Sequence, residues 1–189
     1  MIRIGIVGDI GSGKSYVAKS FGYPVFNADL IVSQLYKKDK KIFSRLKKVL
    51  PKYIFSFPID KKEITRAIIS NKFNLKKIIK IVHLEVRKKM RIFLQQHKRK
   101  KIVILDIPLL LENKINLKND ILIFVQSKKS DVIKRLKKRP NFNPKLLKKF
   151  RDIQLPLDYK RKKSKFIIKN NFTNKLIRKE IKNIIKKII

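Results

Sequence analysis

The chain has 189 residues, 43% of them hydrophobic, which suits one globular domain with an apolar core and is too apolar for a disordered protein. It contains no cysteine, which excludes disulfides, thiolate catalysis and cysteine-based zinc sites. No apolar run approaches the roughly 20 residues that span a bilayer. The short apolar run at residues 2–7 is followed by glycines and a lysine, unlike a signal peptide. We therefore expect a cytoplasmic protein.

The formal net charge of +38 is the most unusual property of the composition. A basic surface binds nucleic acid because it releases counterions from the phosphate backbone. The lysines, however, run along the whole chain, and Lys, Ile and Asn are all encoded by codons rich in A and T. We therefore favour compositional drift over a specific nucleic-acid partner, and we expect the charge to help attract an anionic substrate.

The first half of the chain predicts two strands and a long helical stretch. Residues 2–7 form an apolar run before a glycine-rich turn, as buried parallel strands do, and residues 15–21 predict a helix. A short strand at 24–26 follows. From 30 to 96 the pattern is mainly helical, with a candidate capping box from Asp60 to Glu63 and one long amphipathic helix over 74–96.

The second half predicts three more strands, at residues 101–106, 121–125 and 166–168. A basic helix over 130–139 stops at Pro140, and an amphipathic helix closes the chain over 176–188. Strands separated by helices predict a parallel sheet covered on both faces. The helical stretch before the third strand is then an insertion between two strands of that sheet.

Four of the five glycines, at positions 5, 8, 11 and 13, fall within one short stretch. Residues 8–15, Gly-Asp-Ile-Gly-Ser-Gly-Lys-Ser, fit the P-loop pattern G-x-x-x-x-G-K-S/T between a predicted strand and a predicted helix. Glycines expose backbone N–H groups to phosphate oxygens, and the helix adds its positive N-terminal end. Lys14 then reaches the β- and γ-phosphates, and Ser15 ligates Mg²⁺. The predicted ATP-binding residues here are Gly8, Gly11, Ser12, Gly13, Lys14, Ser15 and Tyr16.

Two aspartates follow predicted strands at the edge where ligands bind in open α/β sheets. Asp106 ends the third strand and either holds the Mg²⁺ shell or caps a turn. Asp29 follows the second strand. It accepts a proton from an attacking hydroxyl, organises Mg²⁺ and water, or acts as the N-cap of the next helix. These residues alone leave a GTPase, an ATPase and a kinase open.

Three stretches resemble the dephospho-coenzyme A kinase family in the same order and at similar spacing. They are residues 4–15, residues 21–29 (Phe-Gly-Tyr-Pro-Val-Phe-Asn-Ala-Asp) and residues 105–112 (Leu-Asp-Ile-Pro-Leu-Leu-Leu-Glu). The resemblance covers nearly the whole chain. It implies a three-layer α/β/α P-loop NTPase fold with a five-stranded parallel sheet. The single kinase domain would have a core at about 1–32, 97–128 and 162–189, a helical substrate-binding insertion at about 33–96 and a lid at about 129–161.

The resemblance also implies a reaction. The γ-phosphoryl group of ATP, with Mg²⁺, passes to the 3′-hydroxyl of dephospho-CoA and gives coenzyme A and ADP. Asp29 would be the general base, acting with Lys14 and Arg139. Arg135 and Arg139 resemble lid arginines, and Asn170 and Gln154 match positions near the nucleotide base. We expect ATP and dephospho-CoA as partners, no specific nucleic acid, no membrane, and a monomer or weak oligomer.

The sequence departs from the family pattern at several of these positions. Asn27 replaces the first aspartate of an Asp-Ala-Asp, and Asp9 stands where glycine is usual beside the phosphates. Tyr16 replaces a threonine and Leu157 an arginine, and His83 lacks the proline that follows it in the family and stays outside the catalytic set. These changes bear on affinity more than on the reaction.

Two other functions remain open from the sequence, because fold does not decide substrate. One is another small-molecule kinase of the same fold that phosphorylates a nucleotide or nucleoside. The other is a basic nucleic-acid-binding ATPase, which needs a clustered basic stripe or stacking aromatics.

Overall fold

The computed structural model describes residues 1–140 and 142–189, with the side chain of Lys72 left out. The chain divides into two compact units. The first contains Met1–Asn27, His97–Phe142 and Gln154–Ile189, and the second contains Ala28–Gln96 and Asn143–Ile153. The expected insertion, 33–96, lies in the second unit. The expected lid, 129–161, is divided between the units and includes Asn141, which lies outside the described residues.

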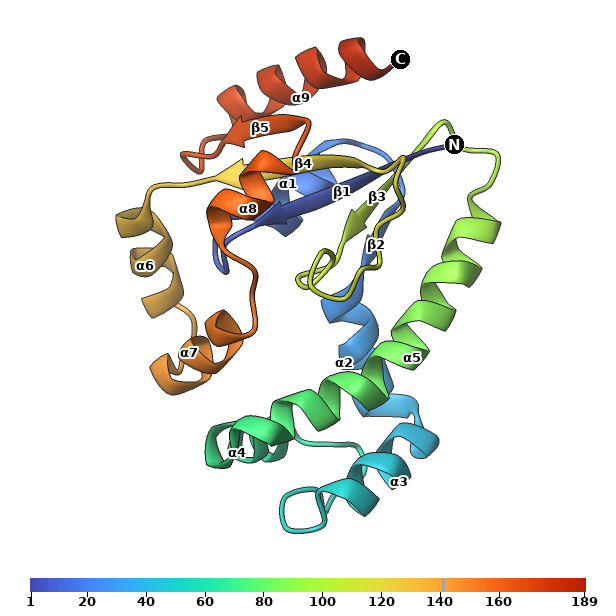
Figure 1. Cartoon of the computed structure of the whole chain (residues 1–189), viewed down its shortest axis with the longest axis vertical. Helices are drawn as coiled ribbons and strands as arrows, with labels where there is room; N and C mark the ends of the chain where they lie inside the picture. Colours follow the sequence, from blue (N-terminus) through green and yellow to red (C-terminus); the bar gives the residue numbers. More distant parts are fainter. Residues whose placement is uncertain (141) are drawn as a thin grey trace. The chain divides into compact units, whose positions relative to one another are not determined.

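The first unit is built on a five-stranded sheet with all strands parallel (Figure 1). The strands are β1 (Ile2–Gly8), β2 (Val25–Asn27), β3 (Ile102–Asp106), β4 (Ile121–Gln126) and β5 (Phe166–Lys169), in the order β2-β3-β1-β4-β5. Continuous apolar runs mark strands buried on both faces. The five predicted strands are therefore confirmed, each within one residue of its expected ends.

Helices α1 (Lys14–Ser20) and α9 (Asn174–Ile188) cover one face of this sheet. Alternate strand residues point to that face because successive side chains of a strand point in opposite directions. The resulting core contains Ile4, Ile6, Ile102, Ile104, Ile123, Val125 and Ile168 from the strands, and Val17, Ala18, Phe21, Ile177, Ile181 and Ile184 from the helical side.

Helix α8 (Leu157–Lys162) contacts β1, and in Figure 1 it crosses the face of the sheet opposite α1. The segment after β3 approaches β1 closely as well: a side chain at Gly5 would place its Cβ 2.5 Å from Leu110 Cδ2. Helix α6 (Lys129–Lys137) follows β4. The unit thus has three layers, helix, sheet and helix, and the expected three-layer α/β/α fold with a five-stranded parallel sheet is confirmed.

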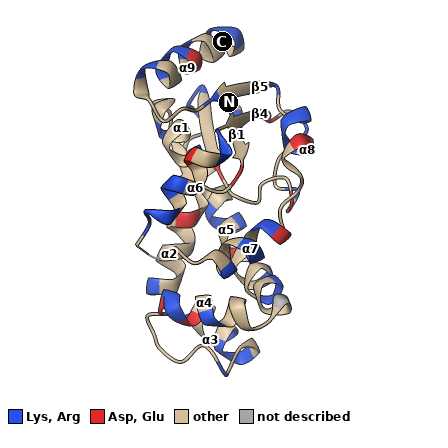
Figure 2. Ribbon diagram, turned by 90° about the vertical axis from the view of Figure 1, so that its left-hand side faces the viewer, with Lys and Arg blue, Asp and Glu red and all other residues tan. Residues whose placement is uncertain are grey.

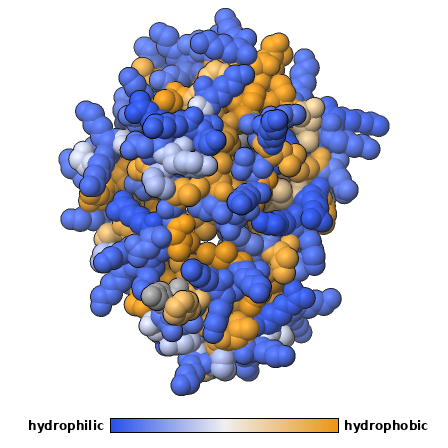
Figure 3. Space-filling model, viewed as in Figure 1, coloured by the Kyte–Doolittle hydropathy of each residue, from blue (hydrophilic) through white to orange (hydrophobic). Residues whose placement is uncertain are grey.

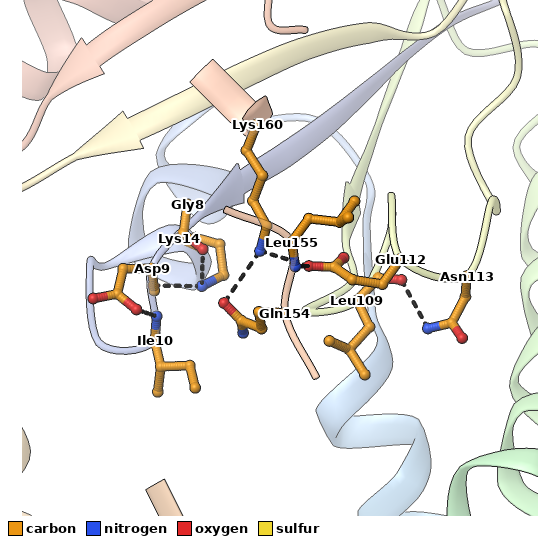
Figure 4. Close-up of polar contacts among 10 residues, drawn as sticks. All are labelled: Gly8, Asp9, Ile10, Lys14, Leu109, Glu112, Asn113, Gln154, Leu155 and Lys160. Carbon is orange, nitrogen blue, oxygen red and sulfur yellow. Dashed lines mark hydrogen bonds and ion pairs between the residues drawn. The ribbon is translucent and has the colours of Figure 1, made fainter. Parts of the chain in front are cut away.

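A buried ion pair fixes α8 to the segment after β3 (Figure 4). Lys160 Nζ lies 2.7 Å from Glu112 Oε1, and the two side chains are only 2% and 9% exposed. Lys160 also donates to Gln154 Oε1 at 3.1 Å, and the backbone N–H of Leu155 donates to Glu112 at 3.1 Å. This Glu112–Lys160 anchor therefore holds residues 154–160 at the point where the chain re-enters the first unit.

The second unit is helical, with α2 (Ala28–Lys38), α3 (Lys40–Val49), α4 (Lys61–Ser70), α5 (Lys72–Gln96) and α7 (Pro144–Asp152). Helix α5 contacts α2, α3 and α4, and α7 contacts α4. The predicted helix over 74–96 is confirmed as α5. Its buried apolar residues recur at helical spacing: Leu75, Ile78, Val82, Val86 and Met90.

The expected capping box at the start of α4 is only half right. Asp60 is the N-cap, and its Oδ1 accepts a hydrogen bond from the Lys62 N–H at 2.8 Å. The part of the prediction in which the Glu63 side chain bonds back to the N-cap N–H is wrong. The buried Glu63 carboxylate accepts hydrogen bonds from the N–H groups of Phe55 and Ser56, at 3.1 and 3.2 Å, and from the Ser56 hydroxyl. Since a buried carboxylate needs several donors, Glu63 turns toward the preceding loop, which supplies three.

The basic residues are dispersed, as expected from the sequence. Every helix of the described chain carries at least one Lys or Arg (Figure 2). In Figure 3, hydrophilic side chains are spread over the visible face, with apolar patches between them. Among the described residues, no helix combines the length and the apolar character that crossing a membrane requires.

The Glu112–Lys160 anchor generates a prediction about stability. We expect Lys160→Met to lower the free energy of unfolding by about 3–5 kcal/mol, because the Glu112 carboxylate is then buried without its cation. Urea denaturation measures the loss. The double variant Lys160→Met/Glu112→Leu should recover much of it, because an apolar pair of similar volume replaces the ion pair. A single variant as stable as the parent would contradict the role given to the pair.

Candidate active site

The P-loop connects the end of β1 to the start of α1. Gly11 and Gly13 have φ angles of +86° and +88°, in the left-handed region that residues with a side chain rarely adopt. Space is also restricted at Gly13, where a Cβ would lie 2.3 Å from Asn170 Nδ2. Backbone conformation and packing thus both require glycine at position 13.

Lys14 is the first residue of α1, and its ammonium group turns back to the start of the P-loop (Figure 4). Nζ donates hydrogen bonds to the carbonyl oxygens of Asp9 at 2.7 Å and Gly8 at 3.3 Å. Ser15 follows on the first turn of α1 and is exposed. The structure therefore gathers the predicted P-loop cation and hydroxyl at one end of the loop.

Tyr16 is also exposed, on the first turn of α1. Its hydroxyl donates to Asn174 Oδ1 at the start of α9, so it ties the N-terminal ends of two helices together. A contact between Tyr16 and ATP stays a prediction.

Asn170, just after β5, holds the P-loop by a hydrogen bond to its backbone. Its side chain is buried, with Nδ2 donating to the Ser12 carbonyl at 2.7 Å and Oδ1 accepting from the Phe172 N–H at 2.8 Å. The hydroxyl of Ser127, just after β4, donates to the same Ser12 carbonyl at 2.9 Å. The bracing role of both residues was missed from the sequence, and a contact of Asn170 with the nucleotide base stays a prediction.

Asp106 lies at the end of β3, next to Asn27 at the end of β2. The two residues are paired in the sheet register, and Asn27 Nδ2 donates to Asp106 Oδ2 at 2.7 Å. The amide at position 27, a departure from the family pattern, therefore orients the Asp106 carboxylate, which an aspartate there would repel. Because β1 and β3 are parallel neighbours, Asp106 and Gly8 end at the same edge of the sheet.

Mg²⁺ prefers oxygen ligands and retains several waters. The Ser15 hydroxyl and the Asp106 carboxylate both supply such oxygens, so these two residues fit the ion. No group of three or more His, Asp or Glu side chains suited to a metal occurs among the described residues.

Asp29 belongs to the second unit and is exposed. Helix α2 begins at Ala28, so Asp29 is the second residue of the helix and lies in its first turn. The alternative that Asp29 is the N-cap is therefore wrong. The role of Asp29 as general base stays a prediction.

Helix α6 packs against the P-loop and carries one of the two predicted lid arginines. A Cβ at Gly11 would lie 3.0–3.1 Å from carbons of Leu136 and Val132. Arg135 is exposed, and its Cζ lies 4.3 Å from the centroid of the Phe172 ring. Arg139 follows α6 and is also exposed. The amide oxygen of Gln154 accepts a hydrogen bond from Lys160 within the Glu112–Lys160 anchor, and its expected place near the nucleotide base stays a prediction.

Comparisons with known proteins agree on one family. The model of the family described as "Dephospho-CoA kinase" matches residues 2–175. A dephospho-CoA kinase from Wolbachia sp. subsp. Brugia malayi is 36% identical over 187 residues, covering 96% of this chain and 95% of that protein. A dephospho-CoA kinase from Bartonella quintana is 34% identical, covering 87% of each.

Solved structures show the same architecture. The crystal structure of TT1252 from Thermus thermophilus has a TM-score of 0.75 and 26% identity, covering 100% of this chain and 98% of that one. The dephospho-CoA kinase from Campylobacter jejuni has a TM-score of 0.64 at 24% identity, covering 98% of this chain and 96% of that one, and supports the fold.

Asp9 generates a prediction about nucleotide affinity. Its Oδ1 accepts a hydrogen bond from the next N–H, that of Ile10, at 2.7 Å, so a negative charge sits on the loop that receives phosphates. Asp9→Asn keeps an acceptor but removes the charge. At about 1 kcal/mol of repulsion, we expect ATP to bind roughly fivefold more tightly. Calorimetry with a non-hydrolysable ATP analogue measures this.

The gain from Asp9→Asn should shrink as salt is raised, because the effect is Coulombic. If Asp9→Asn binds the ATP analogue no more tightly than the parent, the repulsion is contradicted. The main effect of the Asp9 carboxylate would then be to stabilise the conformation of the P-loop.

Proposed function

Because this chain belongs to the dephospho-CoA kinase family, we infer that it catalyses the ATP-dependent phosphorylation of dephospho-CoA to coenzyme A, the last step of CoA synthesis. The observation that carries this inference is the family match over residues 2–175, which includes an intact P-loop. We further propose that the acceptor is the 3′-hydroxyl of the dephospho-CoA ribose.

In the proposed mechanism, the P-loop N–H groups and Lys14 bind the β- and γ-phosphates. Phosphoryl transfer needs positioning and charge neutralisation more than covalent help from the protein. Mg²⁺, held by Ser15 and Asp106, would offset phosphate charge. Two observations support this role for the protein: Lys14 is already hydrogen-bonded within the loop, and Asn27 orients the Asp106 carboxylate.

We propose Asp29 as the general base that accepts the proton of the attacking hydroxyl. Its support is chemical: the carboxylate is exposed, and it follows β2 by two residues, beyond the edge of the sheet where parallel strands end. A ribose hydroxyl is a poor nucleophile unless a positioned base takes its proton.

We propose Arg139 as a catalytic residue and Arg135 as an ATP-binding residue. Both are exposed, on or just after α6, and this helix packs against Gly11 of the P-loop. Guanidinium groups there can stabilise charge on the transferred phosphoryl group. In the part of the chain that the structure describes, the basic residues are spread over every helix, and we propose on this ground that DNA and RNA are not specific partners. We propose separately that the enzyme is a monomer or weak oligomer.

The proposed function is tested with purified protein, ATP, Mg²⁺ and dephospho-CoA, with coenzyme A detected by its mass. Nucleosides and nucleoside monophosphates serve as competing acceptors in the same assay. Coenzyme A should be the main phosphorylated product. A kcat/KM for any nucleoside above that for dephospho-CoA would overturn the assignment.

For Asp29→Asn we expect kcat to fall by roughly 10²- to 10⁴-fold, because the amide keeps the shape but cannot accept the proton. The loss should sit near the lower end if the transition state is loose. Affinity for ATP should change little. Asp39→Asn, at the N-cap of α3 in the same unit, is a matched control and should keep near-parent turnover. A folded Asp29→Asn enzyme with parent-like kcat would remove Asp29 from the mechanism.

For Arg139→Ala we expect a fall in kcat of roughly 10- to 10³-fold from lost charge stabilisation, while ATP still binds the P-loop. Lys138→Ala, which removes the neighbouring exposed cation, is the control for a general loss of positive charge. Equal effects of the two substitutions would indicate long-range attraction of substrate and no specific contact by Arg139.

A further inference from the structure

A guanidinium group lies over an aromatic ring beside the P-loop, and the ring has no part in the mechanism proposed above. Arg135, on α6, has its Cζ 4.3 Å from the centroid of the Phe172 ring, which belongs to the segment after β5. This distance is well within the roughly 6 Å at which a cation is attracted to an aromatic face. The pair therefore joins two segments that flank the P-loop.

Phe172 is held in a conformation that a bulky residue avoids. Its φ is +64°, in the left-handed region, which costs an L-residue with a Cβ roughly 1–2 kcal/mol. Hydrogen bonds fix it there: the Phe172 N–H donates to Asn170 Oδ1, and the next residue, Thr173, donates to Asn171 Oδ1. Strain of this kind is concentrated at functional sites, so the ring position calls for a functional explanation.

The ring also lies against the last glycine of the P-loop. A Cβ at Gly13 would be 3.3 Å from Phe172 Cε1. At the other end of the pair, α6 packs against Gly11 through Val132 and Leu136, the neighbour of Arg135. The pair thus lies beside the loop that is proposed to bind the phosphates, with Phe172 against Gly13 and α6 against Gly11.

A guanidinium group is planar and stacks on aromatic systems through either face. The Arg135 guanidinium lies over the Phe172 ring and the residue is exposed, so part of its side chain is open to solvent; the side away from the ring is called its outer face here. We propose that Phe172 is a positioning residue for the nucleotide: it holds Arg135 flat, and the adenine of ATP stacks on the outer face of the guanidinium. This inference rests on the proposed binding of ATP at the P-loop and adds Phe172 to that site.

The alternative is that Phe172 only supports the P-loop through Asn170. Two probes separate these roles. Inorganic tripolyphosphate occupies the phosphate site alone, whereas ADP also presents the base. A residue that positions the base changes the affinity for ADP only, and a residue that supports the loop changes the affinity for both.

The main variant is Phe172→Leu, which keeps an apolar side chain and its Cβ but removes the aromatic face. Phe172→Tyr, which keeps the face, is the matched control. For Phe172→Leu we expect calorimetry to show the Kd of ADP rising about 3- to 30-fold, the range of a cation–π contact, with the Kd of tripolyphosphate within twofold of the parent. The KM for ATP should rise by a similar factor, with a smaller change in kcat. Phe172→Tyr should bind both probes as the parent does.

If Phe172→Leu fails to fold, Phe172→Gly removes the ring while relieving the strained φ, and it should give the same selective loss of ADP affinity. The inference is overturned if ADP affinity is unchanged in the ring-deleted variant, or if both probes weaken by the same factor. Lys14→Ala tests the underlying site: it should weaken both probes. Were it to weaken neither, the P-loop assignment itself would fail, and the inference with it.

Discussion

The carbonyl oxygen of Ser12 is the point on which the geometry of the nucleotide site depends. It accepts hydrogen bonds from Ser127, just after β4, and from Asn170, just after β5. A P-loop rich in glycine has little conformational preference of its own, so these bonds select one conformation from many. They form because β4 lies next to β1 in the sheet and β5 lies next to β4, so the segments that follow these two strands reach the P-loop. The strand order therefore helps to set the shape of the loop.

Much of the first unit could be predicted from the sequence because its signals are local. Continuous apolar runs mark the buried strands, and the spacing of Gly8, Gly13 and Lys14 marks the phosphate loop within eight residues of chain. Helix α5 was equally clear, since its apolar positions recur over several turns. Each of these patterns lies within one continuous segment, so it can be recognised without knowing which other residues the segment contacts.

The residues that could not be predicted act across long stretches of sequence. Asn170 and Ser12 are separated by 158 positions, and the buried Lys160 pairs with Glu112, which belongs to another segment of the chain. Nothing near Asn27 in the sequence indicates that its amide donates to Asp106. The Glu63 carboxylate was misassigned for the same reason, because a tertiary contact with the loop at Phe55 and Ser56 outcompeted a local capping pattern.

The place of helix α7 in the chain bears on how the two units can move. Helix α7 lies in sequence between two elements of the first unit, α6 and α8, yet it packs against α4 in the second. A displacement of residues 28–96 therefore carries α7 with it, through the packed contact with α4. Because residues 143–153 join the first unit at both ends, after Phe142 and before Gln154, such a displacement would also pull on the chain that follows α6 and on the chain that precedes α8.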